Sequence, residues 1–104
     1  MHISDKNLTK LPFLPEIMEE SLICYHNNLI TLDGSPKHIK GYFSCSYNKL
    51  TSLKGISKKI DKRIYCNRNN LTSLLYTPKS QVIPFCTMNH LLTLDYFPRH
   101  DETF

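Results

Sequence analysis

The stretch FSCSYNKLTSL, residues 43–53, recurs along the chain and decides how it folds. Its counterparts are LICYHNNLITL at 22–32, IYCNRNNLTSL at 64–74 and a weaker copy, PFCTMNHLLTL, at 84–94. Each copy holds one cysteine, and Cys24, Cys45, Cys66 and Cys86 follow one another by 21, 21 and 20 residues. Self-similarity at a fixed period of about 20 residues indicates stacked repeats that share one core.

The repeat unit continues beyond this stretch. An asparagine stands three residues after each cysteine, leucines stand five and eight residues after it, and a proline or serine follows four residues later. Ile3 takes the cysteine position of a shortened first unit, in which Lys6 replaces the asparagine. We therefore expect a single domain over 1–104. It would consist of a truncated leading repeat at 1–15, full repeats at about 16–36, 37–57, 58–78 and 79–98, and a tail at 99–104.

The residues around each cysteine alternate in character, which indicates a half-buried strand. In residues 42–46, Phe43 and Cys45 would point to one side and the other three residues to the opposite side. Segments such as 33–40 hold Gly and Pro and show no helical period, so a regular helix is not expected there. The predicted fold is a β-rich solenoid, with a short parallel sheet on its concave face and irregular or single-turn returns on its convex face.

Two places are expected to depart from regular stacking. Pro84 stands where the other full units have Leu, Phe or Ile, and a proline cannot donate to a strand ladder, so we expect a local distortion there. Residues 1–4 are expected to form an edge strand with one side open. Because an open edge invites pairing, we hypothesise a homodimer, or a partner docked at this uncapped end.

The repeated motif resembles the leucine-rich-repeat family. The recurring Cys-x-x-Asn-x-Leu-Thr-Ser-Leu, with Gly34 and Gly55 nearby, is similar to the compact repeats of about 20–21 residues in bacterial secreted effectors and bacteriophage proteins. The resemblance implies a leucine-rich-repeat solenoid. Its bacteriophage side implies a viral setting, in which such a unit inhibits a host defence protein. The helical N-terminal cap usual in the family is not found in this sequence, and a C-terminal cap is confined to residues 96–104.

The cysteines are expected to be core residues. Zinc sites pair cysteines about two to four residues apart, whereas these four lie at intervals of 20 or 21 residues. Stacked in register, they would point inward in parallel, which is poor geometry for disulfide bonds. Ile3 at the same register favours a small buried apolar side chain at this position.

The asparagines, Asn27, Asn48, Asn69 and Asn89, are expected to form an internal ladder. A residue type kept at one register could also serve as a binding code. In stacked repeats, however, the side-chain amides would satisfy backbone groups where the chain turns off the sheet. We therefore predict a structural role for these asparagines.

The outward strand positions vary from unit to unit and are rich in residue types common in protein interfaces. The candidates for partner contact are Tyr25, His26, Tyr42, Tyr47, Arg63, Tyr65, Arg68 and Phe85. We predict a non-enzymatic protein-binding module that sequesters or inhibits another protein through this face, a host protein if the phage resemblance holds. The alternative is a partly covered surface with incidental aromatic residues.

The charge of the chain leaves a second alternative open. Lys and Arg number 13 and Asp and Glu 9, a formal net charge of +4. Basic residues gather mostly on the return side, at Lys54, Lys58, Lys59, Lys62 and Arg63. A solvated face is the plain interpretation. The alternative function is a nucleic-acid-binding module, because basic residues with Tyr neighbours can hold a single strand, but the modest charge favours a protein partner.

Residue groupings typical of catalysis are not found in the sequence. The five histidines show no i, i+4 pair, and there is no Gly-rich phosphate loop, so we expect no enzymatic activity, no metal and no cofactor. No apolar run approaches the roughly 20 residues needed to cross a bilayer, and we expect no membrane partner. The first residues lack the pattern of a signal peptide. A cytoplasmic location is expected, in the host cell if the chain is phage-encoded.

Overall fold

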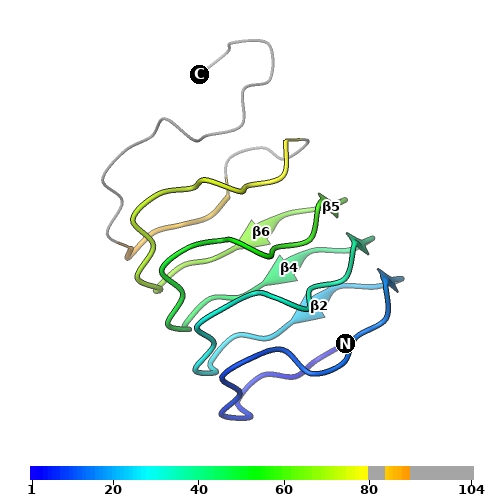
Figure 1. Cartoon of the computed structure of the whole chain (residues 1–104), viewed down its shortest axis with the longest axis horizontal. Helices are drawn as coiled ribbons and strands as arrows, with labels where there is room; N and C mark the ends of the chain where they lie inside the picture. Colours follow the sequence, from blue (N-terminus) through cyan, green and yellow to red (C-terminus); the bar gives the residue numbers. More distant parts are fainter. Residues whose placement is uncertain (80–83, 90–104) are drawn as a thin grey trace.

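A parallel sheet is built from the residues just before the cysteines. The computed structural model describes residues 1–79 and 84–89. The strands of this sheet are β2 (Leu22–Ile23), β4 (Phe43–Ser44) and β6 (Ile64–Tyr65). They pair in parallel in the order β2-β4-β6, so that equivalent residues of successive coils lie side by side. Figure 1 shows the coils stacked in chain order. The predicted parallel sheet is confirmed.

Isolated bridges extend the β2–β4–β6 sheet on both sides. His2 pairs with Ile23, and the Ile3 N–H donates to the Ile23 carbonyl at 2.8 Å, as expected for an edge segment. On the other side Phe85 pairs with Tyr65 in an isolated bridge directly after Pro84. Pro84 has no N–H to donate to this ladder. The rest of the fourth full repeat, 80–83 and 90–98, and the tail at 99–104 lie outside the described residues.

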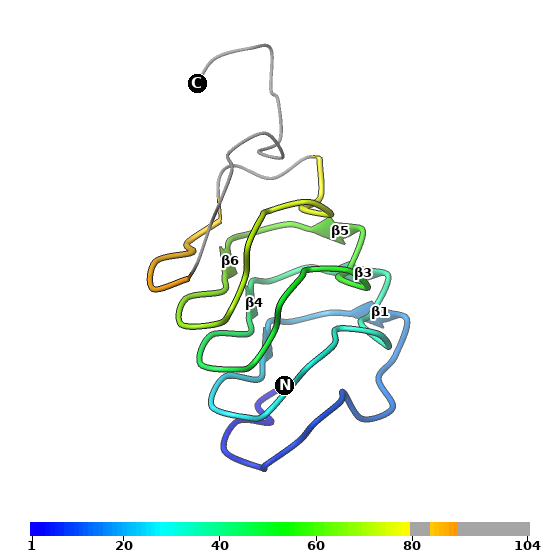
Figure 2. The ribbon, with the colours of Figure 1, turned by 60° about the vertical axis from the view of Figure 1, so that its left-hand side comes forward.

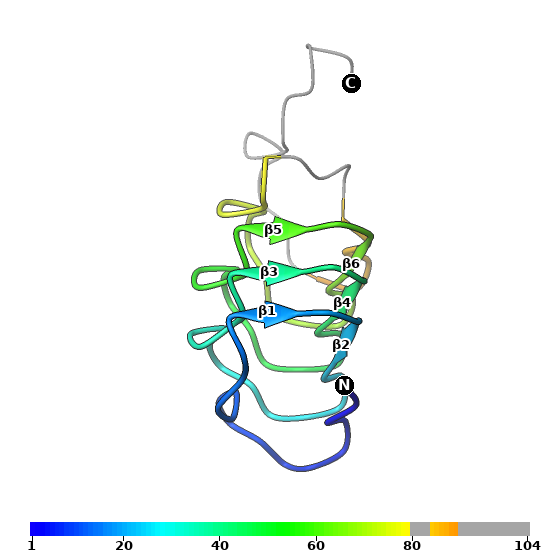
Figure 3. The same cartoon turned by 90° about the vertical axis from the view of Figure 1, so that its right-hand side faces the viewer.

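The return segments form a second parallel sheet, and the expectation of irregular returns is wrong in this respect. Its strands are β1 (Ile17–Met18), β3 (His38–Ile39) and β5 (Lys59–Ile60), paired in the order β1-β3-β5. Figures 2 and 3 show this stack as separate from β2, β4 and β6. Met18, Ile39 and Ile60 share one register and are buried, which anchors each return on the core. The described ranges contain no helix, and thus none long and apolar enough to cross a membrane.

Leucines and cysteines fill the core of the stack. The leucines five and eight residues after Cys24, Cys45 and Cys66 are fully buried: Leu29, Leu32, Leu50, Leu53, Leu71 and Leu74. Cys24, Cys45 and Cys66 are buried among them, and Ile3 and Cys86 pack against the same cluster. Burying one such leucine contributes about 1.5–3 kcal/mol, and each coil obtains that burial from its neighbours. The predicted core role of the cysteines is confirmed.

The asparagines form the predicted ladder between coils. The Asn48 side-chain oxygen accepts the Leu29 N–H at 2.9 Å. Its amide nitrogen donates to the carbonyls of Cys24 and Cys45 at 3.1 and 3.0 Å. Asn27, Asn69 and Asn89 repeat this pattern one coil apart. Each amide thus satisfies backbone groups of two coils at the point where the chain leaves the sheet.

Candidate functional site

Each coil leaves the β2–β4–β6 sheet through a residue with left-handed backbone geometry. His26, Tyr47 and Arg68 have φ values of 57°, 58° and 57°, and Asp5 and Met88 hold 58° and 59° at the same register. This conformation costs an ordinary L-residue about 1–2 kcal/mol, and Gly, Asn, Asp and His adopt it most readily. Three of the five positions carry Tyr, Arg or Met instead. The sequence therefore places large side chains at these turns despite an unfavourable backbone.

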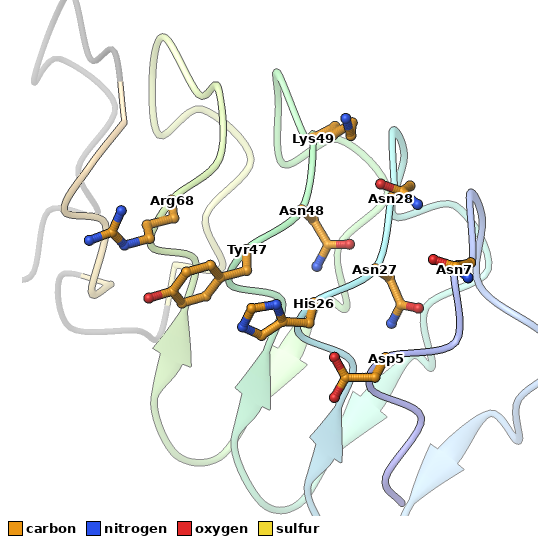
Figure 4. A pocket seen from close by; sticks show the side chains of 9 residues that line it. All are labelled: Asp5, Asn7, His26, Asn27, Asn28, Tyr47, Asn48, Lys49 and Arg68. Carbon is orange, nitrogen blue, oxygen red and sulfur yellow. The ribbon is translucent and has the colours of Figure 1, made fainter.

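These turn residues form a continuous row of side chains, here called the turn row: Asp5, His26, Tyr47 and Arg68. The rings of His26 and Tyr47 stack with centroids 4.3 Å apart and an interplanar angle of 11°. The Arg68 guanidinium carbon lies 5.3 Å from the centre of the Tyr47 ring. Figure 4 shows Tyr47 between His26 and Arg68, with Asp5 at the far end of the row. Both neighbours of Tyr47 thus hold its ring in place.

A polar hollow of about 490 Å³ lies beside the turn row. Its lining comes from four successive coils and consists of Asp5, Asn7, His26, Asn27, Asn28, Tyr47, Asn48, Lys49 and Arg68. Asn27 and Asn48 are buried members of the ladder, so their amides already bond to backbone groups. The hollow carries a carboxylate near its N-terminal side and cationic groups at Lys49 and Arg68.

A second row, here called the strand row, consists of Tyr42, Arg63, Tyr65 and Phe85. Tyr42 meets Tyr65 edge-on, with centroids 5.6 Å apart and an angle of 83°. Tyr65 stacks on Phe85 at 5.1 Å and 10°. The Arg63 guanidinium carbon lies 4.9 Å from the centre of the Phe85 ring. These contacts tie three coils together on the outer side of β4 and β6.

The eight residues predicted from the sequence therefore fall into two groups. His26, Tyr47 and Arg68 lie in the turn row, and Tyr25 joins them through an edge-on contact with His26 at 5.7 Å. The other four make up the strand row. Sequence reasoning missed Asp5, Asn7, Asn28 and Lys49, which line the hollow. The register could have revealed Asp5, because it stands 21 residues before His26.

Ser44 and Ser46 are buried, although the alternation of the sequence predicts that both point outward from the β2–β4–β6 sheet. Each is only 7% exposed, and both side chains are short. The Ser46 hydroxyl oxygen accepts the Asn67 N–H at 3.2 Å, and the Asn67 side chain accepts the Thr87 N–H at 3.0 Å. Small polar residues here link successive coils, which leaves partner contact to the larger side chains.

The buried thiols are poor nucleophiles in this fold. Burial raises the pKa of Cys24 to about 12. Burial, together with the neighbouring cysteine Cys24, raises the pKa of Cys45 well above its ordinary value. Desolvation is also the main cause of the raised pKa of Cys66. The reactive form of a cysteine is the thiolate, and at neutral pH these side chains are thiols. The Cys24 thiol donates to the Ser44 carbonyl, with sulfur and oxygen 3.2 Å apart.

The two rows present ring edges, phenol hydroxyls and guanidinium groups from a fixed backbone. Tyr47 is 45% exposed and Phe85 42% exposed although both belong to ring contacts, so each still offers surface to a partner. Such amphipathic side chains contact apolar and polar groups of a partner at once. No family model, curated protein or solved structure matches the chain, so the assignment of this site rests on its geometry.

Proposed function

We propose that the chain is a leucine-rich-repeat solenoid that binds another protein through the turn row and the strand row. Its action would be to cover the partner's surface. The observation that carries the proposal is the position of Tyr47, exposed at 45% and held between His26 and Arg68 at a strained turn. The backbone conformation of Tyr47 costs about 1–2 kcal/mol. That cost suggests that the ring serves partner binding rather than stability of the fold.

Preorganisation supports this proposal. Ordering a long side chain at an interface costs about 0.5–1.5 kcal/mol, and rings that already contact one another have lost much of that freedom. Tyr and Arg are also the residue types that dominate measured interface energies. Together the two rows supply Tyr42, Tyr47, Tyr65, Arg63 and Arg68.

The charges of this face suggest the chemistry of the partner. Arg63 and Arg68 are both exposed and lie in different rows. Asp5 provides a carboxylate at the N-terminal end of the turn row. A partner that presents carboxylates opposite the arginines, with apolar side chains opposite the rings, would complement this pattern.

A protein partner is favoured over nucleic acid by the stacking itself. A single strand is held by bases stacked on open aromatic faces. The Tyr47 ring has His26 stacked on one side and the Arg68 guanidinium close by on the other, so a base would first have to displace one of them. The resemblance to phage repeats adds a narrower form of the proposal, in which the partner is a host protein that the chain inhibits in the host cytoplasm.

The test uses the whole chain as bait in lysate of its native host, followed by affinity measurements on the partner that is retained. Tyr47→Ala with Arg68→Ala truncates two side chains of the turn row. Tyr42→Ala with Tyr65→Ala truncates two side chains of the strand row. Lys40→Ala with Lys59→Ala, on the other sheet, is the control. We expect each row variant to weaken binding by at least tenfold and the control by less than twofold. Folded row variants that bind as well as the original chain would refute the proposal.

A further inference from the structure

A second hollow, also of about 490 Å³, lies where the chain enters β3 and β5. Its lining consists of Ser35, Pro36, Lys37, Gly55, Ile56, Ser57, Lys58, Tyr76, Thr77, Pro78 and Lys79. It shares no residue with the hollow beside the turn row. Three features of its lining are not explained by coil stacking alone.

The first feature is a column of three lysines at one register, Lys37, Lys58 and Lys79. Their coils are direct neighbours, since the Lys59 N–H donates to the Lys37 carbonyl at 3.2 Å. Lys37 forms an exposed ion pair with Glu16, with nitrogen and oxygen 3.6 Å apart. Lys58 and Lys79 form no ion pair within the part of the chain that the structure describes. Neighbouring coils lie about 4.8 Å apart, so positive charge is concentrated along one side of the hollow.

The second feature is Tyr76, which occupies a glycine position. Gly34 and Gly55 stand 42 and 21 residues earlier, with φ values of 92° and 90°. Tyr76 has a φ of 78° at the same register. A Cβ atom at Gly55 would lie 2.8 Å from the backbone nitrogen of Asp33, so a glycine is needed there for the close approach of coils. An aromatic residue in this backbone conformation is strained, and the side chain lines the hollow at 49% exposure.

The third feature is the hydroxyl of Ser57. The equivalent residues in the neighbouring units are Pro36 and Pro78, so a proline suits this position. Ser57 is 2% exposed, and its hydroxyl has no hydrogen-bond partner among the described residues. A buried hydroxyl without a partner is unfavourable and calls for an explanation. Serine has three staggered side-chain positions, so the hydroxyl can turn to an acceptor that enters the hollow.

We propose that this hollow binds a nucleoside diphosphate or a closely similar phosphate ester of a planar ring. The lysine column faces the phosphates, since lysine is a common phosphate-binding residue. The Tyr76 ring offers a face or an edge to the base, and the Ser57 hydroxyl donates to a phosphate oxygen. The ammonium groups of Lys58 and Lys79 oppose the negative charge of the diphosphate. The third lysine of the column shares its charge with Glu16. This site is separate from the protein-binding rows and does not depend on them.

The test is titration calorimetry of the full chain with three probes: ADP, pyrophosphate and adenosine. We expect ADP to bind more tightly than pyrophosphate by roughly tenfold, the effect of one base stacked on an aromatic ring, and adenosine not to bind. Amide resonances of the non-proline residues in 35–37, 55–58 and 76–79 should shift on addition of ADP. No ADP binding at millimolar concentration would overturn the proposal, as would equal affinity for ADP and pyrophosphate.

Two sets of variants assign the contacts. Lys58→Gln with Lys79→Gln should weaken ADP binding by roughly tenfold or more, whereas the matched control Lys6→Gln with Lys10→Gln removes the same charge elsewhere and should change it less than twofold. Tyr76→Gly relieves the strained backbone, so it should fold. It should lower ADP affinity and leave pyrophosphate affinity unchanged. An equal loss in the control pair, or unaltered ADP affinity in the Tyr76 variant, would contradict the assignment.

Discussion

The imidazole of His26 and the phenol ring of Tyr47 stack with centroids 4.3 Å apart, although each residue has a left-handed backbone conformation. The repeat fixes that conformation, because every coil must turn off the β2–β4–β6 sheet just before its ladder asparagine. The 21-residue period then brings the two rings to the same register on adjacent coils. Strain in the turn and contact between rings are therefore two consequences of one repeated geometry.

Replacement of Tyr47 by asparagine should separate stability from binding. Asn adopts the left-handed region readily, so relief of about 1–2 kcal/mol should offset the ring contacts that are lost, worth about 0.5–1.5 kcal/mol. The free energy of unfolding should stay within about 1 kcal/mol of the original value, while partner affinity falls. Met88→Asn is the control, since Met88 has the same φ and is 61% exposed. It should stabilise the fold, and loss of stability in both variants would argue against strain at the turns.

Removal of an interior ladder asparagine should be strongly destabilising. Asn48→Ala leaves the Leu29 N–H and the Cys45 carbonyl without the partners they have in the buried ladder. We expect the free energy of unfolding to fall by about 2–3 kcal/mol, measured by urea denaturation. The neighbouring Asn28 is partly exposed and lines the polar hollow, so Asn28→Ala should cost less than about 0.5 kcal/mol. Similar losses in both variants would show that the ladder has no special role.

Replacement of Ser57 should raise stability. Ser57→Ala removes a buried hydroxyl that has no partner among the described residues, and such a group costs about 1–3 kcal/mol. Ser57→Pro would also restrict the unfolded chain, which adds about 0.4–1 kcal/mol where the backbone is compatible. Thermal unfolding should therefore occur at higher temperature in both variants. Reduced ADP affinity in these more stable proteins would mean that Ser57 serves the ligand, and a lower melting temperature in both would mean that its hydroxyl is satisfied.

The buried thiols should make the fold sensitive to alkaline pH. Burial raises the pKa of Cys24 from 9.0 to about 12 in the folded state. Below pH 9 the thiol is protonated in both states and stability is unaffected; above it, the unfolded chain loses its proton first. Stability should then fall by about 1.4 kcal/mol per pH unit for each such thiol, until the folded-state pKa is reached.

Urea denaturation at pH 8 and pH 10 measures this loss. The comparison is with Cys24→Ala, which lacks this thiol and keeps every other side chain. The variant should lose about 1.4 kcal/mol less than the original chain over one pH unit above pH 9. Parallel losses in the two proteins would mean that Cys24 ionises in the folded state as freely as in the unfolded state.

The edge at residues 1–4 provides a test of self-association. His2 pairs with Ile23 through the neighbouring groups of Met1 and Ile3, so its own N–H faces the open side of the sheet. If copies associate through this edge, sedimentation should show a dimer that His2→Pro converts to a monomer, because proline lacks the donor. A monomer at every concentration, or a dimer that persists in the variant, would exclude the edge as the contact.

The period of the sequence was sufficient to predict the β2–β4–β6 sheet, the buried cysteines and the asparagine ladder, since each depends on one residue type at one register. The β1–β3–β5 sheet was missed for a physical reason. Its strands follow segments that hold glycine and proline, such as Gly34 and Pro36, and these residue types indicate irregular structure. Only the shared apolar register of Met18, Ile39 and Ile60 marks them.

The candidate site was predictable as a set of residues but not as an arrangement. The positions of Tyr42, Tyr47 and Tyr65 follow from the repeat, whereas their division into two rows depends on backbone φ values and side-chain directions. A positive φ at Tyr47 or Tyr76 is not expected from residue type, because tyrosine disfavours it. The stacking of coils imposes the positive φ, and the sequence alone does not show that constraint.

Hydrogen–deuterium exchange on the complex with the captured partner tests the central claim most directly. The account predicts that binding slows exchange at Asp5, at Phe85 and in the segments 23–27, 42–48 and 63–68, which carry the rest of the two rows. Exchange in β1, β3 and β5 should stay unchanged. Protection confined to the β1–β3–β5 sheet, with the two rows exchanging as in the free protein, would contradict it.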